Sequence, residues 1–532
     1  MGEVTRRTLL AGSAALGSSL VAGTTAAAAP AGTGASPLNT TTVGVQDFRY
    51  ADLVRGQNVR FVSQPEYVRL IQTPDQVAGA VRAAVLAGKR IAVRSGGHCY
   101  EDFVDNAQTQ VVLDLSGMRA IYYDSSRRAF AVESGATLGS VYEALFKGWG
   151  VTVPGGSCPS VAVGGQVAGG GYGQLNRSHG LLVDYLDAVE VVVVRADRTV
   201  QRVIATSAAN DPNRDLWWGH TGGGGGNFGV VTRYWFKTPG ASGSDPTTLL
   251  PRPPAELWIN QVAWPWATLT EAHFGQLVRN FGRWCEQNSA PGSPWTRLFS
   301  RLLLNHQANG TINMVTQIDA SVPGAEAMLQ QFVAAVGNGI PAPQVWDHRR
   351  LPWLHTTTWR AMFGGDATGR ADFKSTYMRA AFPDSHVAAF YRHLTSADYR
   401  NPVAILQIST YGGRTNTVSP TATAVAHRDS VMKMHYLVGW GNEPEDALHI
   451  DYLRRFYRDV YAATGGVPVP NAVTDGCFIN YADIDLSDPA WNTSGVPWHH
   501  LYYKDNYRIL QQVKARWDPT DTFRHAQSIR LP

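Results

Sequence analysis

The chain has 532 residues, 44% of them hydrophobic, and a formal net charge of +4 at pH 7. This length exceeds one ordinary core, so we expect two domains with peripheral segments in a globular protein. The small net charge, without a cluster of Lys and Arg, excludes a nucleic-acid footprint. The four cysteines show neither CxxC nor zinc spacing, which excludes a metal site of that type and a disulfide scaffold.

Residues 1–31 predict an export signal. Arg6 and Arg7 precede a weakly apolar run that ends in small residues around Pro30. This order is typical of a signal peptide, and the arginine pair matches a twin-arginine signal. A generic signal or a disordered leader is the alternative, but the mild hydrophobicity of the run favours the twin-arginine type. We therefore expect a secreted protein, exported in its folded form. No other segment reaches transmembrane length, so no membrane association is expected after the signal is removed.

An α/β pattern over residues 62–238 follows a predicted linker and N-terminal arm at 32–61. Thr73, Pro74 and Gln76 predict a helix start, and apolar residues at helical spacing continue to Gly88. Predicted strands lie at 90–93, 110–115, 129–132, 188–195 and 199–203, and a second helical stripe spans 138–145.

Two glycine-rich segments each carry one nucleophilic side chain. His98 ends RSGGH (94–98) directly after a predicted strand, and Cys158 ends PGGSC (154–158). Glycine allows close approach to a flat ligand, and consecutive N–H groups in such turns can bind a pyrophosphate. The imidazole and the thiol could bond to the same ring. The alternatives are a turn histidine and a small buried cysteine.

Residues 239–465 differ in character from what precedes them. A Pro/Gly/Ser-rich boundary leads into helices predicted at about 268–288, 322–337 and 445–464. Strand-like runs alternate with them at 311–318, 404–408 and 432–438. This pattern predicts a sheet covered on one face by helices. Residues 466–532 form a further C-terminal segment.

The motifs SGGHCYEDFVDN, TGGGGGNFGVVT and NTSGVPWHHLYYK, together with PGGSC, resemble the berberine-bridge-enzyme-like branch of the vanillyl-alcohol-oxidase-type flavoproteins. The likeness covers about residues 60–530 and is greatest to actinobacterial oxidases of sugars and glycosides. It implies an α+β fold with a two-part FAD-binding domain and a substrate domain of antiparallel sheet plus helices. It also implies that the C-terminal segment returns to the FAD domain.

The resemblance implies an FAD held by two covalent bonds, from His98 to the 8α-methyl group and from Cys158 to C6. Three glycine-containing segments and one C-terminal residue would complete its binding site. They comprise Arg94, Ser95, Gly96, Gly97, Gly155, Gly156, Gly164, Gly165, Gly170, Gly171, Gly225, Asn227, Gly229, Val230 and Asn506.

An oxidase of this type moves hydride from a carbon bearing a hydroxyl group to flavin N5, while a base takes the hydroxyl proton. The family often places a tyrosine base where this chain has Phe478, which cannot take a proton. Tyr481 is therefore the first candidate base, followed by Tyr411 and Tyr172. A structural tyrosine bonded to the backbone is the alternative for Tyr481.

We expect a secreted oxidase that acts on an alcohol or hemiacetal of a carbohydrate or glycosylated natural product. It would pass electrons to O₂, form H₂O₂ and act as a monomer. A flavin-dependent dehydrogenase or a C–C bond-forming tailoring enzyme is the first alternative. A flavin-carrying binding protein with a degenerate site is the second, and Phe478 is the feature that favours it.

Overall fold

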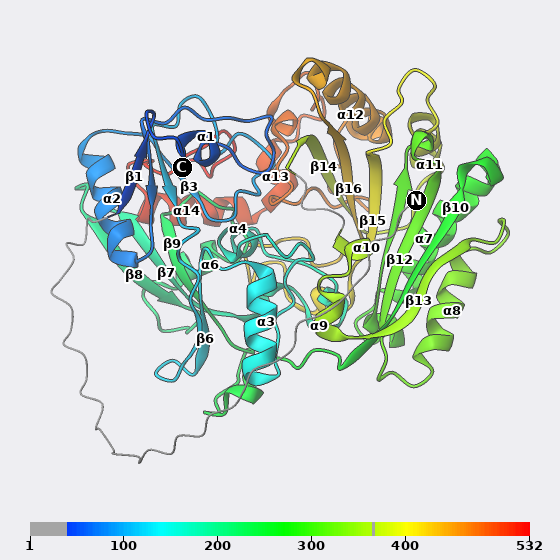
Figure 1. Ribbon diagram of the computed structural model, residues 1–532, viewed down its shortest axis with the longest axis horizontal. Helices are drawn as coiled ribbons and strands as arrows, with labels where there is room; N and C mark the ends of the chain where they lie inside the picture. Colours follow the sequence, from blue (N-terminus) through cyan, green and yellow to red (C-terminus); the bar gives the residue numbers. More distant parts are fainter. Residues whose placement is uncertain (1–39, 364–367) are drawn as a thin grey trace, which may run out of the picture.

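The computed structural model describes residues 40–363 and 368–532, so the expected export signal lies outside the described residues. The described chain forms two lobes side by side (Figure 1). One lobe contains a four-stranded and a five-stranded sheet, and the other is built on a seven-stranded sheet. No helix of the described part is long and apolar enough to cross a membrane.

The four-stranded sheet has the order β1-β2-β4-β3. Its strands are β1 (Thr41–Gly44), β2 (Tyr67–Leu70), β3 (Ile91–Arg94) and β4 (Val111–Asp114). β4 runs parallel to both β2 and β3, whereas β1 is antiparallel to β2. The pairing of β1 differs from the expected arm at 32–61, because residues 41–44 add a strand to this sheet. A four-residue strand bearing two threonines gives little periodic signal, which is why it escapes prediction.

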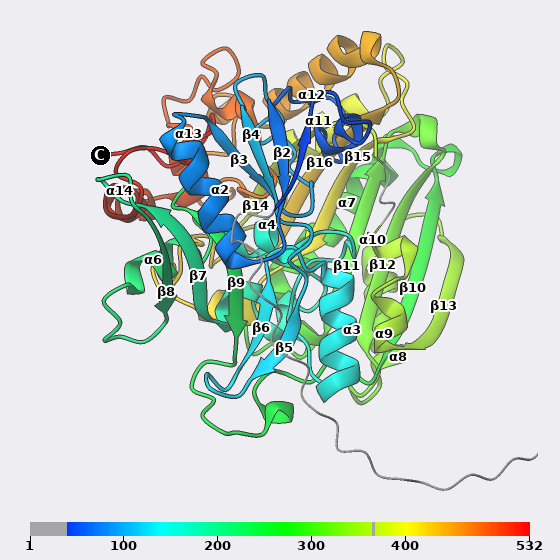
Figure 2. The same ribbon diagram turned by 60° about the vertical axis from the view of Figure 1, so that its left-hand side comes forward.

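The five-stranded sheet is antiparallel, in the order β5-β6-β9-β7-β8. Its strands are β5 (Ile121–Asp124), β6 (Ala129–Glu133), β7 (Leu186–Val194), β8 (Val200–Thr206) and β9 (Val230–Phe236). Helix α2 (Pro74–Leu86) packs between the two sheets of this lobe (Figure 2). As predicted, Thr73 caps α2 by accepting a hydrogen bond from the Gln76 N–H.

Short helices connect the strands of this lobe. Helix α3 begins where Thr137 ends an extended segment, and its C-cap Gly150 adopts φ +69°, as expected for a left-handed cap. The connecting helices are α1 (Tyr50–Leu53), α3 (Leu138–Trp149), α4 (Val163–Ala168), α5 (Asn176–His179) and α6 (Arg214–Gly219). Helices α1, α4, α5 and α6 are shorter than α3 and lie in the loops.

The seven-stranded sheet is entirely antiparallel, in the order β13-β10-β12-β11-β15-β16-β14. It confirms the expected substrate domain of antiparallel sheet plus helices. Its strands are β10 (Glu256–Pro265), β11 (Leu298–Asn305), β12 (Thr311–Asp319), β13 (Gln344–Pro352), β14 (Arg370–Met378), β15 (Ala404–Thr410) and β16 (Met432–Trp440).

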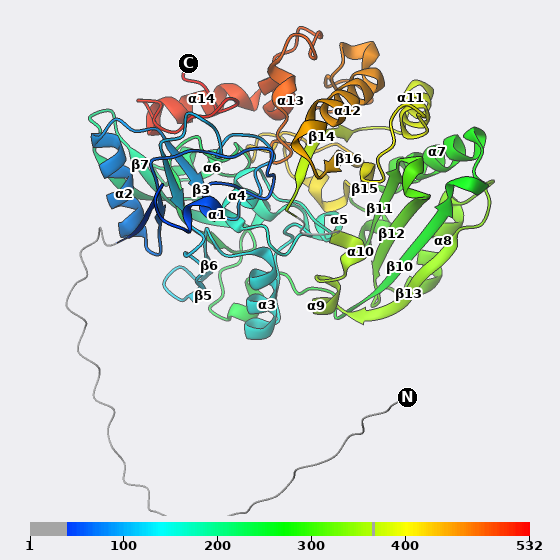
Figure 3. The same cartoon turned by 45° about the horizontal axis from the view of Figure 1, so that its top comes forward.

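Amphipathic helices cover one face of this sheet (Figure 3). On β16, Met432, Met434 and Tyr436 are buried toward these helices, and the Tyr436 ring packs against Phe456 of α12. Alternation along the strand turns Lys433 and His435 to the opposite face, toward the first lobe. The helices are α7 (Glu271–Asn288), α8 (Ala325–Val336), α11 (Asp384–Leu394) and α12 (Asp446–Val460); α9 (Trp353–Thr356) and α10 (Arg360–Phe363) are short.

The C-terminal segment crosses from the second lobe back to the first (Figure 3). It contains α13 (Trp498–Tyr503) and α14 (Asn506–Trp517), and α14 packs on α6. The fully buried Lys514 ammonium donates to the Asn227 carbonyl at 2.9 Å and pairs with Asp518 at 2.7 Å. These bonds fasten the end of the chain to the glycine-rich loop that precedes β9.

Candidate active site

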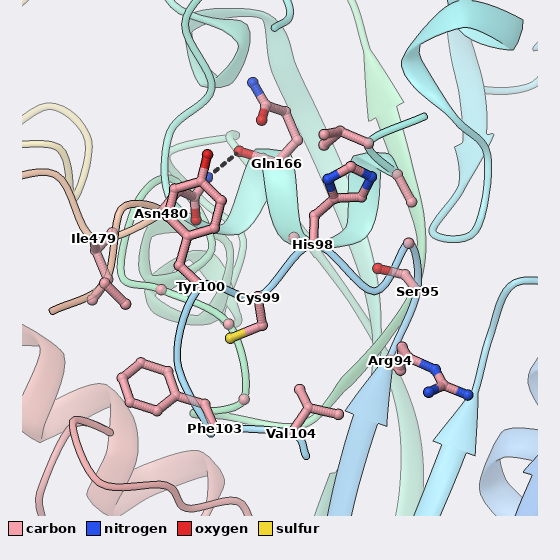
Figure 4. Close-up of a pocket in the computed structure, with 18 of the residues that line it drawn as sticks. Arg94, Ser95, His98, Cys99, Tyr100, Phe103, Val104, Gln166, Ile479 and Asn480 are labelled. Atoms are coloured by element: carbon pink, nitrogen blue, oxygen red, sulfur yellow. Dashed lines mark hydrogen bonds between the residues drawn. The ribbon is translucent and has the colours of Figure 1, made fainter. Parts of the chain in front are cut away.

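A cavity of about 280 Å³ lies at the junction of the two lobes. Residues 94–100, from the loop after β3, form one wall, and 156–158 form a second (Figure 4). Further walls come from 224–227, from 478–482 and from 523–525 near the C-terminus, while Arg301 of β11 reaches in from the second lobe. The structure thus gathers the motifs singled out in the sequence around one space.

His98 and Cys158 both line this cavity, although 60 positions separate them in the chain. Ser160 connects them. Its hydroxyl lies 2.9 Å from His98 Nε2 and 3.5 Å from Cys158 Sγ. All four cysteines of the chain are free thiols. The described residues contain no cluster of three or more His, Cys, Asp or Glu side chains suited to hold a metal ion.

Several motif glycines allow the two loops to pack against each other. A Cβ added at Gly96 would lie 2.7 Å from the Ala162 backbone nitrogen, and one at Gly164 would lie 2.7 Å from Ser95 Oγ. Such contacts are too short for any larger residue. These glycines hold the His98 loop against the Cys158 loop, which fixes the relative position of the two nucleophiles.

Two other glycines instead leave room inside the cavity. A Cβ added at Gly165 meets no atom within 4 Å, and one at Gly225 meets only Ala168 Cβ at 4.0 Å. Both glycines line the cavity. Their missing side chains create a smooth wall of backbone, which suits a large flat ring. The cavity therefore fits a flavin.

Some of the remaining predicted glycines line the cavity, and others lie outside its lining. Gly97 and Gly156 line the cavity, whereas Gly155, Gly170 and Gly171 lie behind it. Gly170 and Gly171 adopt φ +109° and φ +67°, a left-handed backbone that glycine adopts at little cost. These residues shape the loop before Tyr172 without facing the cavity.

Arg94 and Ser95 line the cavity, but the Arg94 side chain turns away from it (Figure 4). Its guanidinium pairs with Asp114 at 2.8 Å and donates to the carbonyls of Leu53 and Arg55. The Arg94 side chain therefore ties β3 to β4 and to the segment around α1, and the predicted contact of this residue with a cofactor stays a prediction.

The Asn227 side chain stabilises the glycine-rich loop before β9 through hydrogen bonds to the backbone of that loop. The Asn227 amide, at the cavity wall, donates to the Gly223 and Gly224 carbonyls, and its side-chain oxygen accepts from the Ile529 N–H. Gly229 and Val230 do not line the cavity. A Cβ at Gly229 would lie 2.6 Å from the Val192 carbonyl oxygen, so this glycine serves strand packing.

Asn506 was expected near a flavin, but it does not line the cavity. It is buried at the start of α14, and its amide donates to the carbonyls of Pro420, Thr423 and Ala424. The side chain thus anchors the loop that precedes β16. A motif cannot distinguish this role from ligand binding, because both need a buried amide.

Of the three candidate tyrosines, two meet at the cavity wall. The Tyr172 and Tyr481 hydroxyls lie 2.6 Å apart, and both residues line the cavity. Tyr411 is fully buried behind Tyr172, with ring centroids 6.3 Å apart, and does not line it. Of these three tyrosines, Tyr172 and Tyr481 are therefore the ones placed to exchange a proton with a molecule in the cavity.

A row of side chains across the second lobe faces this pair, and sequence reasoning missed it. Arg301, Ser409 and Lys433 are direct partners on the adjacent strands β11, β15 and β16. The Lys433 amine is buried, 3.4 Å from the Tyr172 ring centroid and 3.0 Å from that of Phe478. It has no hydrogen-bond partner among the described residues.

Burial governs the titration of this group of residues. Burial raises the pKa of both Tyr172 and Tyr481, and the positive charge of Arg301 opposes that rise. The hydrogen bond within the pair lowers the pKa of Tyr172 and raises that of Tyr481, so Tyr172 is the better anion. Burial also lowers the pKa of Lys433 well below its ordinary value, and the nearby Arg301 charge adds to this.

The His435 ring packs against Tyr481. The two rings stack with centroids 4.1 Å apart, and the Tyr100 ring lies beyond them. Burial lowers the pKa of His435 to about 3, so the imidazole is neutral at ordinary pH. The strand alternation of β16 could have indicated His435 and Lys433, because both fall on the face opposite its apolar residues.

The chain is similar to known proteins along its whole length. The FAD binding domain family matches residues 65–203, and the berberine and berberine like family matches residues 477–530. Aclacinomycin-N/aclacinomycin-A oxidase of Streptomyces galilaeus is 49% identical over 100% of this chain and 99% of its own length. Hexose oxidase of Chondrus crispus is 31% identical over 92% of this chain and 95% of its own.

A crystal structure of glycopeptide hexose oxidase complexed with teicoplanin has 47% identity and a TM-score of 0.89. The match covers 92% of this chain and 99% of that one. Both the family matches and the full-length relatives agree with the resemblance found in the motifs. The chain belongs to the berberine-bridge-enzyme-like family of FAD-linked oxidoreductases.

Proposed function

We propose that this protein oxidises an alcohol or hemiacetal group of a carbohydrate or glycosylated natural product, with O₂ as electron acceptor and H₂O₂ as product. The observation that carries the proposal is the Tyr172–Tyr481 contact of 2.6 Å in the cavity that His98 and Cys158 also line. It combines a proton acceptor with two attachment points for a flavin. The named activities of the oxidases reported above support the choice of substrate class.

The flavin is proposed to be FAD attached twice, with His98 on the 8α-methyl group and Cys158 on C6. The cavity-facing Gly165 and Gly225 support this placement, because they leave space beside the two nucleophiles. When bound, the flavin takes hydride from the substrate carbon and transfers its electrons to O₂.

Tyr172 is proposed as the group that takes the substrate hydroxyl proton. Before the transfer Tyr172 is a phenolate, stabilised by a hydrogen bond from the Tyr481 hydroxyl and by the positive charge of the Arg301 guanidinium, and it becomes a neutral phenol on taking the proton. A cation over an aromatic face is attracted to it, so ionised Tyr172 also favours a proton on Lys433. The two groups are expected to titrate as a coupled pair. This assignment places Tyr172 ahead of Tyr481, the first candidate from sequence.

Phe478 supports a second candidate function. Its ring lines the cavity where relatives carry a tyrosine, and it covers one side of the Lys433 amine. An altered proton path would suit a flavin-dependent dehydrogenase or an oxidative tailoring enzyme that forms a C–C bond. A flavin-carrying binding protein is the remaining alternative, and it predicts no turnover.

A substrate panel distinguishes these functions. Purified protein would be mixed with hexoses, oligosaccharides and glycosylated aromatic or peptide natural products, while H₂O₂ release and flavin absorbance are followed. The proposal predicts one H₂O₂ per substrate oxidised. A dehydrogenase would turn over only with an artificial acceptor. A flavin that no substrate reduces would contradict the proposal and favour the binding protein.

Export by the twin-arginine route is part of the proposal, with the protein acting outside the cell as a monomer. It rests on Arg6 and Arg7, which lie outside the described residues. An attached flavin agrees with this route, because twin-arginine transport carries folded proteins. Replacing both arginines by lysine should keep flavin-loaded protein inside the cell. Continued export would contradict the route, and size-exclusion chromatography would test the monomer.

A further inference from the structure

The Ser160 side chain contacts both proposed attachment points. Its hydroxyl lies 2.9 Å from His98 Nε2 and 3.5 Å from Cys158 Sγ. A hydroxyl group can accept one hydrogen bond and donate another at the same time. One oxygen atom is therefore placed to act on the imidazole and the thiol together.

The backbone holds Ser160 in this position. Its neighbours Pro159 and Val161 accept hydrogen bonds, each 2.9 Å long, from the N–H groups of Gly139 and Leu138 at the start of α3. A Cβ at Gly139 would lie 3.1 Å from Pro159 Cβ, so glycine allows this close packing. The turn carrying Ser160 is thus docked on the first turn of a helix rather than left to solvent.

We propose that Ser160 is a positioning residue for the formation of both flavin bonds. The inference rests on the proposed double attachment. In this arrangement His98 Nε2–H donates to Ser160 Oγ, so Nδ1 carries the lone pair that attacks the 8α-carbon. The Ser160 O–H in turn donates to Cys158 Sγ and stabilises the thiolate that attacks C6. A single hydroxyl thereby selects the reactive tautomer of one nucleophile and the reactive charge state of the other.

Each bond replaces one hydrogen of the flavin. The Nδ1–C bond replaces a C–H bond of the 8α-methyl group, and the S–C bond replaces the C6–H bond. In each case the displaced flavin hydrogen and the N–H or S–H hydrogen of the nucleophile both leave as protons, and the two electrons of the broken C–H bond remain on the flavin. Dioxygen removes them and becomes H₂O₂, so two bonds consume two molecules of O₂.

Ser157 provides a matched control in the same loop. It lies next to Cys158 in the chain and also lines the cavity, but its hydroxyl accepts a hydrogen bond from Arg301 at 2.7 Å. Ser157→Ala thus removes a nearby hydroxyl group without touching the recorded Ser160 contacts. Ser160→Thr keeps the hydroxyl group and adds only a methyl group, and should restore what Ser160→Ala loses.

The experiment measures attachment rather than turnover. Wild type, Ser160→Ala, Ser160→Thr and Ser157→Ala would be collected at matched early times after induction. Mass spectrometry of the digested proteins then gives the fraction of His98 and Cys158 peptides that carry flavin, and total flavin is measured separately. A hydrogen bond to a charged group is worth ~1.5 kcal/mol or more, so Ser160→Ala should lower the Cys158-linked fraction roughly tenfold.

We expect Ser160→Ala to lower the His98-linked fraction as well, while total flavin stays near the wild-type amount and Ser160→Thr and Ser157→Ala resemble wild type. Wild-type attachment in Ser160→Ala would overturn the role of Ser160 and leave the double attachment intact. An equal loss in Ser157→Ala would also overturn it, because the loop rather than the hydroxyl group would then matter. A wild type without either bond would overturn both proposals.

Discussion

The Tyr172 and Tyr481 hydroxyls lie 2.6 Å apart at the wall of the cavity, although 309 positions separate the two residues in the chain. Tyr172 follows the glycine-rich loop of the first lobe, and Tyr481 comes from the segment that leads into the C-terminal region. The contact therefore depends on the return of the chain to the first lobe. It brings together two tyrosines that the sequence indicates only separately, as candidate bases in two different motifs.

Removing either hydroxyl group should slow oxidation without releasing flavin. Loss of a positioned base costs about 10²–10⁴-fold in rate, so Tyr172→Phe should fall within this range and Tyr481→Phe should be affected less. Steady-state kinetics with flavin absorbance as the loading control would measure both. A larger loss in Tyr481→Phe would assign the base to Tyr481 instead.

The wild-type rate should rise with pH. Burial places the pKa of Tyr172 above its ordinary value of 10.0, and the phenolate that accepts the proton becomes more populated as pH increases. The Tyr172→Phe variant should lose this rise. The pH dependence of kcat/KM in both proteins tests the assignment, and an unchanged profile in the variant would argue against it.

Replacing Lys433 by methionine should stabilise the fold and slow the enzyme. The folded-state pKa of this lysine is lowered from 10.5, so the unfolded chain binds the additional proton. The free energy of unfolding of the wild type therefore decreases as the pH falls below about 10, because the unfolded chain takes up this proton. Lys433→Met lacks this loss, so its melting temperature should exceed that of the wild type, by a margin that grows toward neutral pH. Its rate should fall roughly tenfold, because a desolvated cation over an aromatic ring contributes ~2 kcal/mol or less. A melting temperature of Lys433→Met below that of the wild type would contradict the predicted gain in stability.

Two glycine variants should separate packing from cofactor binding. Gly165→Val places a side chain in the open cavity, so the protein should fold but contain little flavin. Gly96→Ala introduces a contact of 2.7 Å with the Ala162 backbone and should cost about 1–3 kcal/mol of stability. Flavin absorbance and thermal unfolding would be measured for both. Full flavin loading of Gly165→Val would show that the ring does not lie against this wall.

Acid should destabilise the protein in part through His220. Burial lowers the pKa of this histidine from 6.5 to about 4, so the unfolded chain binds the proton more tightly. The contribution of His220 to the free energy of unfolding is fully present above about pH 6.5. It decreases by on the order of 3 kcal/mol between pH 6.5 and pH 4. His220→Gln should flatten this part of the unfolding profile. If the stability of the wild type and of His220→Gln fell equally steeply with decreasing pH, His220 would be excluded as a source of the acid sensitivity.

Local signals in the sequence predicted most of the first lobe and the two nucleophiles, but not the short strands β1, β2 and β5. The cap at Thr73, the strands and the glycine loops each depend on neighbours within a few residues. The motif glycines were predicted to face a ligand, but only some of them do. Gly164 and Gly229 do not line the cavity and serve packing contacts instead, and no local pattern distinguishes a packing partner from a flat ring.

The second lobe and the proton acceptor depend on register. Arg301 and Lys433 are aligned through Ser409 because three strands pair at specific positions, which one strand's sequence does not specify. Strands β10, β11, β13 and β14 were not predicted, and β11 escaped prediction although its partner β12 is the next strand in the chain. Phe478 was recognised as a departure, but the Lys433 amine beneath its ring became apparent only with the fold.

The most direct test of the account is the fate of the flavin when the protein is denatured with acid. Wild type, His98→Ala, Cys158→Ala and the double variant would be precipitated, washed and examined for flavin absorbance in the pellet and the supernatant. Two independent bonds predict that wild type and both single variants retain flavin in the pellet, whereas the double variant releases it. Release of flavin from the wild type would contradict covalent attachment, and release from one single variant would reduce the two bonds to one.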